Sequence, residues 1–112
     1  MIVIDPEVAG ALASAVPQAD FVQILHAFEA DLDRLAQDCA RAAESGDPQA
    51  LRRAAHSLAG TAAGIGAQRL EAAAREAMQA GDDPDPALIA RIRTETAAVL
   101  VELASMAKPR PR

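Results

Sequence analysis

Residues 51–66 of the chain read LRRAAHSLAGTAAGIG, a helical pattern that carries a single histidine among small, apolar and arginine residues. At about 100° of rotation per residue, the leucines, Ile65 and several alanines share one face, and His56 points well away from it. Its neighbours on the helix surface are two arginines one turn earlier and four small residues in the next two turns: Arg52, Arg53, Ala59, Gly60, Ala63 and Gly64. We therefore predict that His56 stands exposed on a low, smooth surface.

The glycines of this helix need an explanation. A glycine inside a helix costs roughly 1 kcal/mol relative to alanine, and this helix holds one at Gly60 and another near its end at Gly64. One explanation is that a residue without a side chain lets the backbone of a partner approach the histidine. The alternatives are that Gly60 packs against a neighbouring helix inside the protein, or that it is neutral in an alanine-rich chain. The outward histidine beside it favours the first explanation.

Composition limits the fold and the partners. The chain has 112 residues, which is enough for one core but too short for two. Phe21 and Phe28 are its only aromatic residues, so the core must consist of aliphatic side chains and alanines, a composition that favours closely packed helices. The formal charge of −5 argues against nucleic-acid binding, which needs a basic face.

Cysteine usage and hydropathy indicate the compartment. Cys39 is the only cysteine, so neither an intramolecular disulfide nor a cysteine-based zinc site can form, and its place on an apolar stripe predicts a packed, unreactive thiol. The apolar residues 1–4 are interrupted at once by Asp5-Pro6-Glu7, unlike a signal peptide. No segment approaches the roughly 20 apolar residues of a membrane helix. We expect a cytoplasmic protein that does not associate with membranes.

Helix signals recur along the first half of the chain. Asp5-Pro6-Glu7 combines an N-cap, a proline at the first helical position and a favourable acidic charge, and it predicts a short helix ending near Pro17. A much longer helix is predicted from about Ala19 to Glu44, where apolar residues recur at spacings of three and four. The same cap-and-proline signature at Asp47-Pro48 begins the helix that carries the histidine.

Two further helices are predicted in the second half. Gly64 and Gly66 bracket a kink or a tight turn, after which a fourth helix extends to about Gly81. A cluster of turn and cap residues at 82–86 begins the fifth and last helix, whose apolar stripe reaches Met106.

These elements predict an all-α fold. Four amphipathic helices joined by short loops imply an antiparallel up-down-up-down four-helix bundle, with the short N-terminal helix covering one end. We expect one helical domain over residues 1–107 and a disordered tail at 108–112. Such a bundle can bury its apolar stripes internally, so we expect a monomer.

An exposed histidine on a bundle permits few chemistries. His26, the only other histidine, lies on another helix and away from the apolar stripe, so no metal-ligand set exists. Ser57 adjoins His56, but consecutive helical residues diverge by about 100° and cannot form a catalytic triad. No nucleotide-binding motif occurs, so the chain is not expected to phosphorylate itself.

Phosphoryl transfer fits what remains. Imidazole is largely neutral near pH 7 and offers a nucleophilic nitrogen without prior proton removal. The histidine face has no carboxylate cluster, so the chain itself needs no cofactor and a partner must bring the magnesium ion, which demands close docking at Ala59, Gly60, Ala63 and Gly64. Arg52 or Arg53 can then hold the phosphohistidine by charge-assisted hydrogen bonds, although either arginine taken alone fits a solvated helix edge equally well.

Residues 56–67, which read HSLAGTAAGIGA, resemble the motif of histidine-containing phosphotransfer (HPt) domains, roughly His-x-Leu-Lys-Gly-Ser/Ala-Ala/Ser-x-x-Leu/Ile-Gly-Ala. The matching positions are His56, Leu58, Gly60, Ala62, Ile65, Gly66 and Ala67. The resemblance extends over nearly the whole chain. It implies a four-helix bundle that relays phosphoryl groups to and from aspartates on receiver domains of response regulators and hybrid histidine kinases, with His56 as the phosphorylated residue.

One position departs from the family pattern. Where the family has a lysine three residues after the histidine, this chain has Ala59. The resemblance then implies that another side chain supports the phosphoryl group, or that transfer is weak. The candidates are Arg52, Arg53, Arg75 and Gln79. The leading expectation is a relay intermediate without kinase activity of its own, and the alternative is a non-catalytic adaptor that binds a receiver domain through the same face without being phosphorylated.

Overall fold

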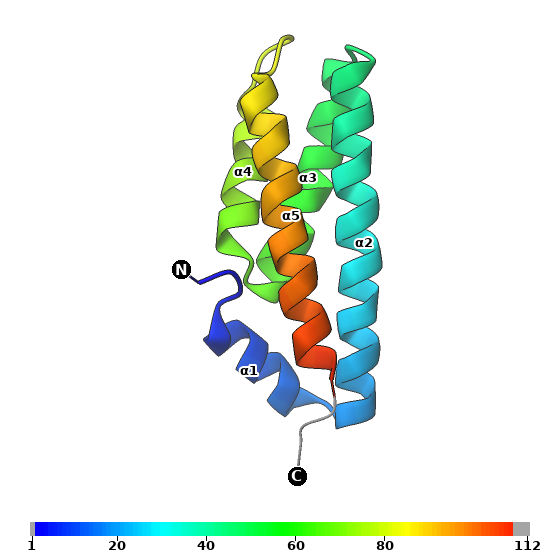
Figure 1. Cartoon of the computed structure of the whole chain (residues 1–112), viewed down its shortest axis with the longest axis vertical. Helices are drawn as coiled ribbons and strands as arrows, with labels where there is room; N and C mark the ends of the chain where they lie inside the picture. The colour runs from blue at the N-terminus through cyan, green and yellow to red at the C-terminus, as the bar shows by residue number, and fades with distance from the viewer. Residues whose placement is uncertain (1, 109–112) are drawn as a thin grey trace.

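The computed structural model of the chain describes residues 2–108. Over this range it contains five helices and no strands (Figure 1), so the predicted all-α fold is confirmed. The helices are α1 (Pro6–Ala15), α2 (Gln18–Glu44), α3 (Pro48–Ile65), α4 (Gln68–Gln79) and α5 (Pro86–Ala107). Of the tail that we expected to be disordered, residues 109–112 lie outside the described residues.

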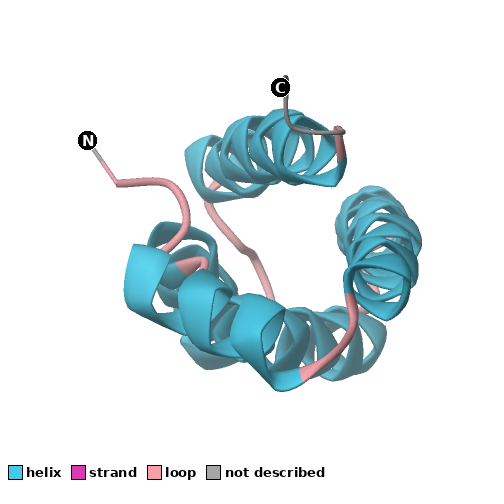
Figure 2. Cartoon of the chain, turned by 90° about the horizontal axis from the view of Figure 1, so that it is seen from below, coloured by secondary structure: helices cyan, strands magenta, loops and turns pink. Residues whose placement is uncertain are grey.

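Helices α2 to α5 form the antiparallel four-helix bundle. Going around the bundle, α2 packs against α3, α3 against α4, α4 against α5, and α5 against α2. The end-on view in Figure 2 shows these helices arranged around a common axis. Helix α3 therefore lies diagonally opposite α5 and contacts α2 and α4. The short α1 touches α2 and α3 at the lower end of the bundle in Figure 1, as the sequence predicted.

Aspartate caps begin three of the helices. The side chains of Asp5, Asp47 and Asp85 accept hydrogen bonds from backbone N–H groups of the first turn, over 2.9, 3.0 and 2.9 Å, and each is followed by proline. Each cap satisfies a donor that the helix leaves without a partner and stabilises its helix by about 1 kcal/mol. The cap-and-proline signatures in the sequence were therefore sound predictors of where helices begin.

The connection between α3 and α4 is a tight turn, not a kink. Gly66 ends α3 in the left-handed conformation (φ 78°), and the Ala67 N–H donates back to the Ala62 carbonyl over 2.9 Å. The N-terminal segment lies against this turn, because the Asp5 N–H donates to the Gly66 carbonyl over 2.8 Å. A Cβ atom at Gly66 would lie only 2.9 Å from the Cβ of Val8, so glycine is required here for two independent reasons.

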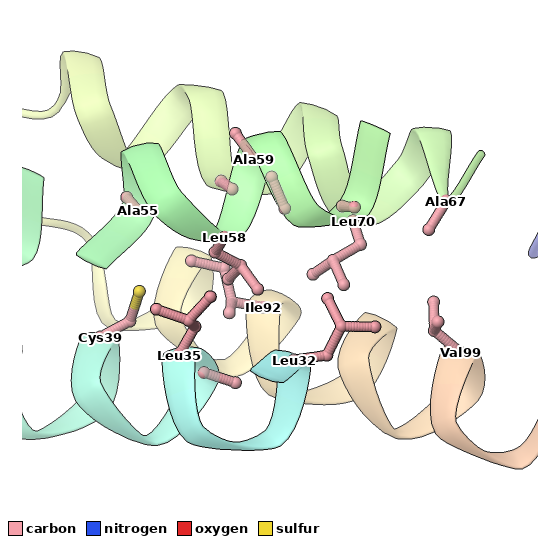
Figure 3. Close-up of a cluster of buried hydrophobic side chains, with 14 of the residues drawn as sticks. Leu32, Leu35, Cys39, Ala55, Leu58, Ala59, Ala67, Leu70, Ile92 and Val99 are labelled. Atoms are coloured by element: carbon pink, nitrogen blue, oxygen red, sulfur yellow. The ribbon is translucent and has the colours of Figure 1, made fainter. Parts of the chain in front are cut away.

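The core consists of leucine, isoleucine, valine and many alanines, as the low aromatic content predicted. Figure 3 shows its central part, where Leu32, Leu58, Leu70 and Ile92 are fully buried. Cys39 is also fully buried, and burial, with a smaller contribution from the charge of Asp38, raises the pKa of its thiol to about 11. The prediction of a packed, unreactive cysteine agrees with this environment.

Candidate functional site

The outer face of α3 carries the candidate site. Leu51, Leu58 and Ile65 point into the core at no more than 2% exposure, and His56 is exposed on the other side of the helix. The periodicity of the sequence thus assigned the core face of α3 correctly, and the predicted outward position of His56 is confirmed. An imidazole in this position is open to a group carried on another molecule.

Gly60 leaves open space one turn after the histidine. It is exposed, and a Cβ atom built at this position would have no neighbour within 4 Å apart from its own helix. The explanation in which Gly60 packs against a neighbouring helix is therefore wrong. The helix accepts the cost of a glycine without any gain from internal packing, which leaves close approach from outside or a neutral residue as explanations.

Ala63 and Gly64 extend the low surface of α3 beyond Gly60. Ala63 and Gly64 are exposed, and a Cβ atom at Gly64 would lie 3.4 Å from Cε1 of Phe28 on α2. Gly64 thus leaves a surface low and at the same time accommodates the Phe28 ring. Both residues keep the outer face of α3 flat beyond Gly60.

Ala59 does not lie on the predicted docking surface. Only 3% of this residue is exposed, and Figure 3 shows it among the buried side chains of the core cluster. A helical wheel treats α3 in isolation, but α4 packs along the flank of α3 that carries Ala59. The expectation that Ala59 contributes to partner docking is therefore wrong.

The cations near His56 come from two helices. Arg52 and Arg53 are exposed on α3, and neither forms an ion pair within residues 2–108. Arg75 on α4 donates to a single carboxylate oxygen of Glu71, from Nε over 2.9 Å and from Nη2 over 2.7 Å. All three guanidinium groups retain N–H donors for an anion.

The two edges of α4 face different neighbours. Arg69 and Glu76 form ion pairs with Glu95 and Arg91 of α5, so they mark the edge that faces α5. Helical periodicity sets Arg75 on the opposite edge, toward α3, whereas Gln79 lies on the outward side at the last residue of α4. Among the α4 candidates, Arg75 is thus the one on the same side of the bundle as the histidine.

Sequence reasoning missed a groove beside the site. It has a volume of about 570 Å³ between α2 and α3, and its lining includes Arg34 and Arg41 of α2 together with Arg53 and Ser57 of α3. Arg34 and Arg41 are seven residues apart, two helical turns, which sets them on one edge of α2. That spacing was visible in the sequence, but the edge of α2 that meets α3 was not.

Three further observations concern possible metal ligands, the second histidine and the length of the helices. Between residues 2 and 108, no group of three or more histidine, cysteine, aspartate or glutamate side chains is placed to hold a metal ion. His26 is exposed on α2, in agreement with its predicted surface position. None of the five described helices is both long and apolar enough to cross a membrane.

Comparisons with known proteins place this geometry in a family. The model of the Hpt domain matches residues 23–102. Among solved structures, the chain is similar to the crystal structure of histidine-containing phosphotransfer protein B (HptB) from Pseudomonas aeruginosa PAO1, with a TM-score of 0.76 and 27% sequence identity over 94% of each chain. A search of curated proteins finds no match.

Proposed function

The chain belongs to the Hpt domain family of histidine phosphotransfer proteins, and from this we propose that it is a phosphorelay intermediate whose phosphoryl carrier is His56. The observation that carries the proposal is the exposed imidazole on α3 with open space at Gly60 one turn further along. A docked protein can approach the ring closely there. The donors and acceptors are aspartates of receiver domains in response regulators and hybrid histidine kinases.

The transfer needs little from this chain beyond a well-presented nucleophile. A lone pair on a neutral ring nitrogen, Nε2 in the outermost position, forms the N–P bond while the P–O bond to the aspartate of the partner breaks. The carboxylate leaves with the bonding electrons. In the reverse direction an aspartate of the next receiver domain attacks phosphorus and the imidazole leaves, so one histidine both accepts and donates the group.

Magnesium is expected on the partner. Helix α3 carries no aspartate or glutamate between residues 48 and 65, so this chain offers no hard oxygen ligands beside the histidine. The receiver domain would supply the ion that neutralises charge on the transferring group. On this side, Arg52, Arg53 and Arg75 are the proposed supports for the phosphoryl oxygens, with Gln79 a more distant candidate.

Substitution of the carrier tests the proposal. Because His56 is exposed and outside the core, the variant His56→Gln is expected to keep the helical circular dichroism and the unfolding midpoint of the wild-type chain. Incubated with an acetyl-phosphate-charged receiver domain, it should acquire no acid-labile, base-stable label. His26→Gln removes the other exposed histidine and should be labelled like the wild type. Label on a residue other than His56 would refute the assignment of the carrier.

An adaptor role is the second candidate. The absence of the family lysine at Ala59 favours it, because a domain that binds without transfer has no need of a cation at this position. The same incubation separates the two functions: an adaptor forms a complex with the receiver domain but takes up no label. If ATP and magnesium alone labelled the chain, both candidates would be wrong.

We also propose that the chain acts as a monomer. Within residues 2–108 the large hydrophobic side chains that remain exposed are Ile2 and Val101, and they come from the N-terminal segment and from α5. Single exposed apolar residues are common on monomeric proteins. A sedimentation measurement that gives a dimer mass at micromolar concentration would contradict this.

A further inference from the structure

The groove between α2 and α3 is lined on its α3 side by residues that neighbour His56 along the helix, although His56 itself does not line it. Arg53 precedes the histidine by one turn and Ser57 follows it, and both line the groove. Arg34 and Arg41 line its α2 side. A segment of a partner seated in this groove would therefore touch the protein within one helical turn of the proposed phosphoryl carrier.

The groove is positively charged in an acidic protein. The chain carries a formal charge of −5, yet three arginines and one carboxylate, Asp38, line this groove. Asp38 is shared between Arg41, at 2.8 Å, and Arg34, at 3.8 Å. Asp31 also contacts Arg34, over 3.5 Å, and with it included the net charge of these three arginines and two aspartates is still +1. Arg53 forms no ion pair within the described chain.

The opposite side of the bundle has a different charge pattern. There the arginines of the α4–α5 interface are paired across the helices, Arg69 with Glu95 and Arg91 with Glu76. The α2–α3 groove thus gathers three arginines against one carboxylate, whereas Arg93 is an isolated arginine of α5 without an ion pair within residues 2–108. Because the rest of the surface is acidic, an acidic partner would be repelled elsewhere and attracted here.

The floor of the groove is apolar and low. Leu35 and Ala42 are each 6% exposed, and Ala54, which also lines the groove, is half-buried. Such a floor fits one or two apolar side chains of modest size. Arginines at its rim fit carboxylates on either side of them, by charge-assisted hydrogen bonds.

We propose that the α2–α3 groove is the specificity-determining docking surface for the receiver domain, and that it takes a segment in which acidic residues flank a small apolar anchor. This inference rests on the proposed function and adds the chemistry of the partner surface. The arginines of the groove steer and hold the partner, while the transfer itself occurs at His56. A partner with a basic segment at the same place would be rejected.

Charge reversal in the groove tests the proposal. Arg41→Glu changes the groove, and Arg93→Glu is the matched control with the same change in net charge, on α5 diagonally across the bundle from α3. The probe is the acetyl-phosphate-charged receiver domain that transfers fastest to the wild-type chain in a panel of purified receivers. At about 50 mM salt we expect Arg41→Glu to lower kcat/KM about tenfold and Arg93→Glu to change it less than about twofold. The difference should shrink at about 0.5 M salt, where charges are screened over a few ångströms.

A second donor separates this inference from the proposed function. Phosphoramidate is a small molecule that phosphorylates histidine without docking, so it should label the wild type and Arg41→Glu at equal rates. If neither donor labels the wild type, or if no receiver domain transfers to it, the proposed function fails and the inference fails with it. If transfer occurs but Arg41→Glu behaves like Arg93→Glu, or loses labelling by phosphoramidate as well, the inference alone is overturned.

Mapping the complex provides an independent check. Titration of the same receiver domain into the isotope-labelled chain should shift the backbone amide resonances of α2 and α3 that border the groove. Shifts concentrated on α4 and α5 would contradict the proposal, whatever the kinetic result.

Discussion

Replacing Gly60 with alanine should make the protein more stable and a poorer phosphoryl acceptor. The added Cβ atom has no neighbour within 4 Å, so it costs nothing in packing. Alanine is favoured over glycine in a helix interior by about 1 kcal/mol, partly because the unfolded chain loses freedom. The free energy of unfolding should therefore rise by about 1 kcal/mol, which corresponds to about 4 °C in Tm for a domain of this size.

The same methyl group stands on the surface that a receiver domain must approach. A displacement of the partner by about 1 Å from the productive geometry can slow a transfer reaction up to about 100-fold. We expect a decrease in kcat/KM of between about 10-fold and 100-fold for transfer from an acetyl-phosphate-charged receiver domain. Labelling by phosphoramidate should be unchanged, because that donor is small enough to reach the ring past the methyl group.

Gly10→Ala is the matched control for this variant. Gly10 lies inside α1, is exposed and also has nothing within 4 Å of its Cβ position, but it belongs to a different helix from His56. It should add up to about 1 kcal/mol of stability and leave transfer unaffected. A Gly60→Ala protein that is stabilised yet transfers at the wild-type rate would refute close approach as the reason for the glycine. A destabilised one would refute the geometry of open space itself.

Two further predictions concern the fold. Gly66→Ala should lower the free energy of unfolding by about 1–2 kcal/mol because of its left-handed backbone, and by about 1–3 kcal/mol more because of the clash with α1. Gly46→Ala, at φ 67° and with free space around it, should show only the first of these losses. Equal losses for the two variants in urea unfolding would contradict this. The buried thiol of Cys39 has a pKa of about 11 against 9.0 for the free group, so stability present below pH 9 should fall as the pH rises toward 11. Urea unfolding at several pH values checks this, because Cys39→Ala should lose that part of the pH dependence and the chain has no tyrosine and only one lysine to mask it.

The bundle could be predicted from local signals because those signals are independent of tertiary context. Aspartate caps followed by proline mark where α1, α3 and α5 begin, and the left-handed Gly66 marks where α3 ends. Each acts through hydrogen bonds or backbone angles within a few residues. The long apolar stripe of α2 fixed its length for the same reason. The order of packing around the bundle depends on pairs of helices, and only the short loops constrained it.

The site could be predicted only as far as one helix determines it. The outward position of His56 follows from the periodicity of α3 alone. The burial of Ala59 and the arginine groove do not, because they depend on which neighbouring helix covers each flank of α3. Gly60 required the structure for a different reason, since the sequence cannot distinguish a glycine that faces another helix from one that faces solvent.

The buried Ala59 also changes the question of the missing lysine. Because α4 covers this position, a long side chain here would have to leave between two packed helices, and the small alanine allows α4 to approach closely. Arg75 lies on the edge of α4 that faces α3, the helix that carries the histidine. Arg75 spends two of its five N–H donors on Glu71 and keeps three, so it can contact a phosphoryl group without giving up its position. We propose that Arg75, a cation on the edge of α4 that faces α3, supports the phosphoryl group in place of the lysine that α3 lacks.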